Sequence, residues 1–443
     1  MHPSLARRDG SKPWLRSRSR QSISTTLAPS VETARTRGQP AALDAVRAMV
    51  AAGLPHALLF VGPSSVGKTT LALDVAAALF CSAEPPWIRP CRECRACRIV
   101  ETGNHPDLHR IGPEGAGGQI RIGERSNPDP ASVRGLISAL SLLPVEGGAR
   151  VAIVEHADRM NEDAQSALLK TLEEPPAGVA IILCADEEEL LLPTVRSRCA
   201  RVRLGPVGTR DIEVILGELA EIDPPTAARL GRLSAGRPGV ALSYARNPPA
   251  AIGRAEMART LIDLLGAPRA RRLSAIRQVL AQAGEIGASL AAAAVEGGGL
   301  RPSTSRGRGR ARAVGTAVDG DPPDSDIVDG ETSARRLAPA ERRQALGVLI
   351  DVWRDVARDV RLVQLGERSS VRDPGLLDDL AGVVETVRPA EIVVFLDRLT
   401  RAGELLAVAN VSPELLADAL VLAWPRASGV SDSRALDAAE SAS

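Results

Sequence analysis

Residues 56–70 read HALLFVGPSSVGKTT, and this stretch decides the fold of the chain. Its first six residues form a short, largely apolar run of the length of one buried strand. The next eight, from Gly62 to Thr69, follow the pattern G-x-x-x-x-G-K-[S/T], in which the backbone curls around phosphate oxygens with its N–H groups pointing inward. A helix beginning at Thr69 would add the positive end of its dipole. The stretch predicts a strand, a phosphate-binding loop and a helix.

The loop residues have expected roles in binding ATP and Mg²⁺. The ammonium group of Lys68 would reach the outer phosphates, and the hydroxyl of Thr69 would bind Mg²⁺. The alternative is a chance glycine-rich turn, which accounts for neither the strand before the motif nor the helix after it. The candidate nucleotide-binding residues are Gly62, Pro63, Ser64, Ser65, Val66, Gly67, Lys68, Thr69 and Thr70.

Strand and helix patterns alternate around this loop. Because parallel strands are joined through helices, the alternation predicts an α/β domain with a parallel sheet covered on both faces. The further predicted strands are residues 108–111, 150–155, 179–185 and 200–204, and the predicted helices are residues 41–52, 69–80, 130–143 and 161–172.

Four cysteines follow the loop within a short segment. Two spacings of two residues let thiolates of one knuckle reach a single ion, and a more distant cysteine closes a tetrahedron, so we expect a closed structural Zn²⁺ site. The alternative is four free buried cysteines. We expect His105 and His109 to lie at the surface or to face a partner, and Cys184 to lie in the core. The candidate metal ligands are Cys81, Cys91, Cys94 and Cys97.

The strand predicted at residues 150–155 ends with Glu155, which is followed by His156. A nucleotide hydrolase of this architecture ends this strand with two carboxylates, one to help place Mg²⁺ and one to polarise the attacking water. Glu155 could serve as a weak form of the first, whereas an imidazole at the second position adds no negative charge. Asp158 is expected to turn away. The sequence predicts ATP binding with slow turnover or none; the alternative is that Glu155 is a surface acid.

Bulk properties narrow the class of protein. A length of 443 residues predicts two or three domains, and a net charge of +1 excludes a global positive field for nucleic acid. No apolar run reaches the roughly 18 residues of a membrane span. Six cysteines, four of them clustered, do not form a secreted disulfide scaffold, so we expect a reducing cytoplasm.

Composition also marks segments that cannot bury enough apolar surface to fold. Residues 1–37 are rich in Arg and Ser and are predicted to be a disordered basic tail. A transit peptide, a nucleic-acid-binding arm and an upstream start codon are the alternatives. Residues 297–335 are predicted to be a disordered insertion between helical stretches, and residues 427–443 a disordered tail.

Three further motifs identify a family: ALLKTLEEPP at residues 167–176, SRC at 197–199 and GRPG at 236–239. Together with the loop and the cysteines, they resemble the AAA+ clamp-loader subunits of the bacterial DNA polymerase III holoenzyme. The resemblance implies an α/β plus all-α architecture. Its parts are an AAA+ domain (38–205) with a zinc module (81–97), a helical lid (206–247) and a helical collar (248–426) used for pentamer assembly.

The family contains ATP-hydrolysing gamma/tau motor subunits and a delta-prime subunit with little ATPase of its own. Motor subunits carry Asp-Glu where this chain has Glu155 and His156, so the resemblance favours delta prime. The segment WRDVARDVRLVQLG at 353–366 is similar to the collar of that subunit. The start of the family pattern is only partly present at residues 34–40, where the adenine pocket normally forms.

The resemblance also implies roles for two arginines. Arg198 would be an arginine finger acting on the ATP of a neighbouring subunit, and Arg237 would contact this subunit's own nucleotide. Their alternatives are a salt-bridged residue at the start of a strand and a solvent-facing residue at a helix start. Glu173 and Glu174 are expected at a partner contact or in a solvated loop.

The implied partners are the gamma/tau and delta subunits in a heteropentamer, with the sliding clamp and primer-template DNA reached through the complex and no membrane involved. The chain would thus belong to a DNA-directed DNA polymerase, a nucleotidyltransferase complex, with weak or absent ATPase of its own. The alternative functions are an ATP-hydrolysing gamma/tau motor and a zinc-stabilised interaction scaffold outside replication.

Overall fold

The computed structural model describes residues 33–85, 88–113, 118–126, 128–146, 148–296, 339–408 and 411–426. The predicted disordered segments at 297–335 and 427–443, and residues 1–32 of the predicted basic tail, lie outside the described residues. Within the described part, no helix combines the length and the apolar character that a membrane crossing requires.

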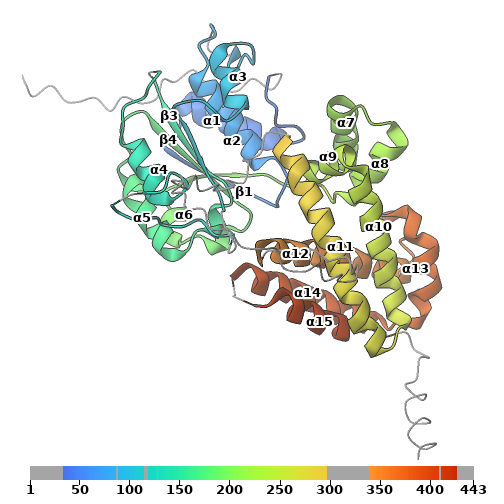
Figure 1. Ribbon diagram of the computed structural model, residues 1–443. Helices are drawn as coiled ribbons and strands as arrows, with labels where there is room; N and C mark the ends of the chain where they lie inside the picture. Colours follow the sequence, from blue (N-terminus) through green and yellow to red (C-terminus); the bar gives the residue numbers. More distant parts are fainter. Residues whose placement is uncertain are drawn as a thin grey trace, which may run out of the picture.

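A parallel sheet forms the centre of the first part of the chain (Figure 1). Its strand order is β2-β3-β4-β1-β5, so β4 lies between the strand that leads into the loop and the strand that ends before Glu155. The predicted parallel sheet is therefore confirmed. The strands are β1 (Ala57–Val61), β2 (Leu108–Ile111), β3 (Arg150–Val154), β4 (Val179–Ala185) and β5 (Ala200–Arg203).

Both faces of the sheet are buried because alternate side chains of each strand point to opposite sides. In β1, Leu58 and Phe60 pack in the hydrophobic cluster that includes Leu71, whereas Leu59 and Val61 pack with Leu136 in the other. Helices cover the two faces: α1 (Pro40–Ala52), α2 (Lys68–Phe80) and α3 (Arg95–Glu101) on one, and α4 (Val133–Leu140), α5 (Glu162–Glu173) and α6 (Pro193–Arg196) on the other.

Local signals explain where these helices begin and end. Ser132 caps α4, because its hydroxyl accepts a hydrogen bond from the Gly135 N–H, so this helix is shorter than the predicted 130–143. Cys94 caps α3, a helix within the cysteine segment that the sequence analysis missed. The segment's prolines and cysteines obscured its short helical pattern.

The second part of the chain is entirely helical in the described residues (Figure 1). One hydrophobic cluster runs through it, from Leu216 and Leu230 to Trp353 and Trp424. Its helices are α7 (Thr209–Ala220), α8 (Pro224–Leu233), α9 (Pro238–Arg246), α10 (Pro248–Asp263), α11 (Arg269–Glu296), α12 (Pro339–Gln364), α13 (Leu377–Val383), α14 (Pro389–Val408) and α15 (Pro413–Ala423). Short 3-10 turns at 264–266, 368–370, 374–376 and 384–386 lie between them, and two more at 157–159 and 188–190 follow strands of the sheet.

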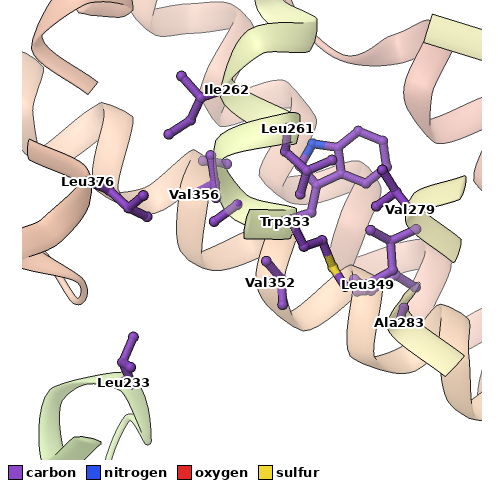
Figure 2. Close-up of a cluster of buried hydrophobic side chains, with 14 of the residues drawn as sticks. Leu233, Leu261, Ile262, Val279, Ala283, Leu349, Val352, Trp353, Val356 and Leu376 are labelled. Atoms are coloured by element: carbon purple, nitrogen blue, oxygen red, sulfur yellow. The ribbon is translucent and has the colours of Figure 1, made fainter. Parts of the chain in front are cut away.

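Trp353 lies at the centre of this helical cluster, among Leu261, Leu349 and Val356 (Figure 2). Its ring centroid is 5.3 Å from that of Phe395 and 5.7 Å from that of Trp424. A chain with 2% aromatic residues thus concentrates three of its large rings at one point, where they bury more apolar area than aliphatic side chains could.

Candidate nucleotide site and cysteine centre

The loop predicted to bind phosphate lies between β1 and α2, at the carboxyl end of the sheet. Gly62 passes against the end of β5: a Cβ atom at this position would lie 2.0 Å from the carbonyl oxygen of Leu204. Gly62 and Gly67 have positive φ angles, as does Ser65 with φ 61°. The local structure is therefore the strand, glycine loop and helix that the motif requires.

The side chain of Lys68 points back into the loop. Its Nζ atom donates to the carbonyl oxygens of Gly62 and Pro63, both at 2.7 Å, and lies 2.6 Å from Oδ1 of Asp186. Only 7% of Lys68 is exposed. The ammonium group that is expected to bind phosphate therefore already contacts oxygen atoms of the protein.

The sequence analysis missed Asp186. This residue directly follows β4, and the loop directly follows β1, which pairs with β4. Because the carboxyl ends of adjacent parallel strands meet at one edge of a sheet, a polar residue at the end of the 179–185 run was a usable signal.

Two more polar groups surround Asp186. Nδ1 of His156 lies 3.4 Å from Oδ2 of Asp186, and the backbone N–H of Asp186 donates to Oδ1 of Asp158 at 3.0 Å. Asp158 therefore faces this cluster, and the expectation that it turns away was wrong; the 3-10 turn at 157–159 brings it back over β4.

The charges of this cluster shift its pKa values in different directions. The hydrogen bond with Asp186 raises the pKa of His156. Burial acts to raise the pKa of Asp186, but the hydrogen bond with His156 and the charges of His156 and Lys68 outweigh it and lower that pKa to about 2. Burial raises the pKa of Asp158. Asp186 is therefore the group held most firmly as an anion.

Glu155, the candidate magnesium-binding acid, is paired with a neighbouring cation. Its Oε1 accepts from Arg110 Nε at 3.0 Å and from Arg110 Nη2 at 2.6 Å. Both side chains are largely buried, with 6% of Arg110 and 12% of Glu155 exposed. The guanidinium group comes from β2 and neutralises the carboxylate, which weakens its attraction for a metal ion.

Arg198, the predicted arginine finger, lies at the surface after α6. Its Nη1 donates to the carbonyl oxygen of Thr194 at 2.8 Å, and its Nη2 forms an ion pair with Glu173 at the end of α5. A third of the side chain is exposed. In the described part of the chain, none of these contacts involves the loop of residues 62–69.

Arg237 lies beside the loop in the fold, but its charge is directed elsewhere. Its Nη1 is 3.2 Å from Oδ2 of Asp351 in α12. Two residues on, the N–H of Gly239 donates to the carbonyl oxygen of Ser65 at 3.0 Å, so the first turn of α9 touches the loop itself. The helix is in place for a contact with nucleotide, whereas the guanidinium group is bound to the helical part of the chain.

Gln39, in the partial adenine-pocket motif at residues 34–40, contacts the loop. Nε2 of Gln39 donates to the carbonyl oxygens of Gly205 at 2.7 Å and Val66 at 3.4 Å. Gln39 is buried, and a Cβ atom at Gly38 would lie 2.4 Å from a methyl carbon of Val207. These contacts fasten the start of the described chain to the loop.

The four clustered cysteines are brought together as the spacing predicts. Their sulfur atoms all lie within 4.8 Å of one another, with Cys81 3.6 Å from Cys91 and 3.9 Å from Cys94. A tetrahedral zinc ion with Zn–S bonds of about 2.3 Å places its sulfurs about 3.8 Å apart. The donor set and its spacing therefore fit a four-coordinate metal ion.

Backbone N–H groups point at three of these sulfurs and act in favour of their thiolate forms, whereas burial raises the pKa values of Cys81 and Cys97. Sγ of Cys81 accepts from Cys91 N, Sγ of Cys91 from Cys94 N and Sγ of Cys94 from Cys97 N, each at 3.4 Å. Burial acts to raise the pKa of Cys94, but its hydrogen bonds with Cys97 lower that pKa to about 6.

One of the two nearby histidines differs from its predicted position. His105 is only 4% exposed, and its ring stacks on that of Phe80 with centroids 3.9 Å apart. His109 is half-buried, with Nε2 3.3 Å from Nη1 of Arg150. The expected surface or partner-facing position is therefore wrong for His105, because its ring is buried by stacking on Phe80, 25 residues earlier in the sequence. Cys184 is in the core, as predicted.

Asp74 connects the cysteine segment to the helix that begins at Lys68. The carboxylate is 1% exposed and accepts from Thr36 N at 2.9 Å, from Thr36 Oγ1 at 2.7 Å and from Arg35 N at 3.1 Å. It also pairs with the guanidinium group of Arg92, the residue after the second cysteine. A single buried anion therefore holds the cysteine segment, α2 and the start of the described chain together.

We expect the Asp74→Asn variant to lose about 3 kcal/mol of unfolding free energy, because it leaves the guanidinium of Arg92 without its buried partner. Denaturant-induced unfolding measures this loss. The matched control is Asp44→Asn on α1, where the carboxylate is 70% exposed and forms an ion pair with Arg47; we expect a change below about 0.5 kcal/mol. Equal effects for the two variants would show that Asp74 does not hold these segments together.

A glycine loop follows β1, β4 separates β1 from β3, and the first turn of α9 contacts the loop; this arrangement is that of an AAA+ fold. Residues 38–208 match the family model described as DNA polymerase III, delta subunit. This segment resembles the delta-prime subunits of DNA polymerase III, which confirms over these residues the family resemblance predicted from its motifs.

Three relatives show the extent of the similarity. The chain is 38% identical over 146 residues to the DNA polymerase III subunit delta' of Pseudomonas aeruginosa (33% of this chain, 42% of that protein). It is 32% identical over 204 residues to that of Bacillus subtilis (46% and 58%). It is also 30% identical over 188 residues to the subunit tau/gamma of Haemophilus influenzae (41% and 26%). The chain thus spans about half the length of these two delta' relatives.

Proposed function

We propose that this chain is the delta-prime subunit of a bacterial replicative clamp loader. It would bind ATP weakly or without efficient hydrolysis, supply an arginine to a neighbouring ATP site, and help load the sliding clamp on primed DNA. The observation that carries the proposal is the match of residues 38–208, which contain the glycine loop and the cysteine centre, to the delta-subunit family. The delta' relatives support it over a scaffold outside replication.

The environment of the loop supports weak hydrolysis. Attack on the γ-phosphate needs a metal ion to neutralise developing charge and a group that orients water. The candidate magnesium-binding acid, Glu155, is neutralised by Arg110. The next residue, His156, is paired through Nδ1 with Asp186, and its imidazole adds no negative charge where a hydrolase carries its water-activating carboxylate.

Arg198 supports a role in trans. A guanidinium group can bind the γ-phosphate with two parallel donors and stabilise the charge that builds on it. Arg198 lies at the surface, and its ion pair with Glu173 is partly exposed, so a neighbouring subunit can replace Glu173 at low cost. The proposed neighbours are the gamma/tau and delta subunits in a heteropentamer.

The cysteine centre supports a structural zinc ion held by Cys81, Cys91, Cys94 and Cys97. Zinc would supply four bonds that fix the segment, with no open position for catalysis. The cysteine segment would then hold Arg92 against Asp74 in α2, the helix that begins at Lys68.

We expect the purified chain to hydrolyse ATP no faster than its Lys68→Ala variant, and to form a stable complex when gamma/tau and delta subunits are added. Phosphate release and size-exclusion chromatography measure the two properties. Rapid turnover by the chain alone, lost in the Glu155→Gln variant, would instead identify a motor subunit. Failure to assemble with either partner would contradict the clamp-loader role altogether.

A further inference from the structure

We propose that Asp186 acts as an internal substitute for phosphate: its carboxylate holds the ammonium group of Lys68 in the nucleotide-free chain, and a nucleotide must displace it to bind. Of the proposed function, this inference uses only the ability of the glycine loop to bind nucleotide. It assigns to Asp186 the role of setting the affinity of that loop.

The first argument is that protein oxygens already surround the ammonium group of Lys68. A lysine ammonium group has three N–H donors. Three oxygens lie within 2.7 Å of Nζ: the carbonyl oxygens of Gly62 and Pro63 and Oδ1 of Asp186. Two of the three belong to the loop itself, so Asp186 is the one partner that a phosphate can replace without refolding the loop.

The second argument is that the fold holds Asp186 in this position. Its backbone N–H is bound to the buried Asp158, and Oδ2 lies against His156. The residue before it, Ala185, accepts a hydrogen bond from the N–H of Gly62 at 3.3 Å, which ties the end of β4 to the start of the loop. The contact with Lys68 is therefore built into the carboxyl edge of the sheet.

The third argument concerns the cost of displacement. Oδ1 of Asp186 is buried and accepts no hydrogen bond of standard geometry from the described residues, so the ion pair with Lys68 compensates its burial. A phosphate that takes Lys68 leaves this carboxylate without that partner and places a second negative charge beside it. Both effects oppose binding.

The test uses the full-length chain with Asp186→Asn, which keeps the shape and removes the charge. Calorimetric titration with ADP and with ATP is carried out once with EDTA and once with Mg²⁺. We expect both nucleotides to bind on the order of tenfold more tightly in both conditions, the effect of removing one charged hydrogen-bond partner. The control, Glu187→Gln, neutralises the adjacent exposed acid and should leave the affinity unchanged.

A second pair of variants separates competition from a general change in structure. In a Lys68→Met background, Asp186→Asn should give a clearly smaller gain in affinity than in the wild-type background, because the group that the carboxylate masks is missing and only the repulsion of phosphate is relieved. Thermal unfolding confirms that each variant is folded. A gain of the same size without Lys68 would overturn the inference.

Three other results would also overturn it. Unchanged affinity in Asp186→Asn would show that the carboxylate does not compete with phosphate. Weaker binding with Mg²⁺ but not with EDTA would make Asp186 a magnesium ligand. No nucleotide binding by any variant would reject a masked site, yet would leave the delta-prime proposal intact, since that is judged from assembly with gamma/tau and delta.

Discussion

Replacing Cys97 with serine is expected to abolish zinc binding and to lower the midpoint of thermal unfolding by about 10 °C. Cys97 lies on α3 and is fully buried against α2, where its sulfur lies 3.9 Å from the carbonyl oxygen of Ala77. Structural zinc contributes about 10 kcal/mol or more to the folding of small zinc modules. Here the sheet and α2 stay folded when the metal is absent, so we expect the free energy of unfolding to fall by only about 3 kcal/mol. Each kcal/mol lowers the midpoint of thermal unfolding by about 2–4 °C.

Elemental analysis of the purified chain measures the metal, and calorimetry measures the unfolding midpoint. We expect one zinc ion in each wild-type chain and none in Cys97→Ser. The matched control is Cys199→Ser, because Cys199 is a half-buried cysteine outside the cluster and should keep the zinc. A wild-type chain without zinc, or equal midpoints for the two variants, would contradict a structural metal site.

Features whose residues lie close together in the sequence could be predicted, whereas contacts between distant residues could not. The glycine loop and the cysteine cluster each lie within 17 residues, so their spacing alone determines which atoms can meet. The sheet could be predicted because buried strands appear as apolar runs. The site residues themselves were predicted by type, but their partners were not.

Those partners are set by strand order and by helix packing. Lys68 meets Asp186 because β4 pairs with β1, and Glu155 meets Arg110 because β2 pairs with β3. Local periodicity contains no information on which strands become neighbours. The contact of Arg237 with Asp351 crosses 114 residues and depends on how the start of α9 lies against α12. The predicted roles of these cations therefore compete with ion pairs that only the folded chain reveals.

Replacing Arg198 with alanine is expected to slow hydrolysis at one ATP site of the assembled clamp loader by about 10³-fold, the lower end of the contribution of an arginine finger. Only the site that this subunit completes should be affected, so single-turnover measurements on the complex are needed to separate it from the others. The matched control is Arg201→Ala. Arg201 is an exposed arginine on β5 whose ion pair with Glu188 is 3.3 Å long, and its loss should leave turnover unchanged.

The ion pair between Arg198 and Glu173 gives a further readout of the same role. If Arg198 must leave Glu173 to reach a neighbour's ATP, then Glu173→Gln should keep the site active or increase its rate, whereas Arg198→Ala inactivates it. If the ion pair were purely structural, the two variants would instead impair the complex equally. Unchanged single-turnover rates in Arg198→Ala, with the complex intact by size-exclusion chromatography, would reject the finger role, because a guanidinium group that stabilises the transition state cannot be removed without slowing its site.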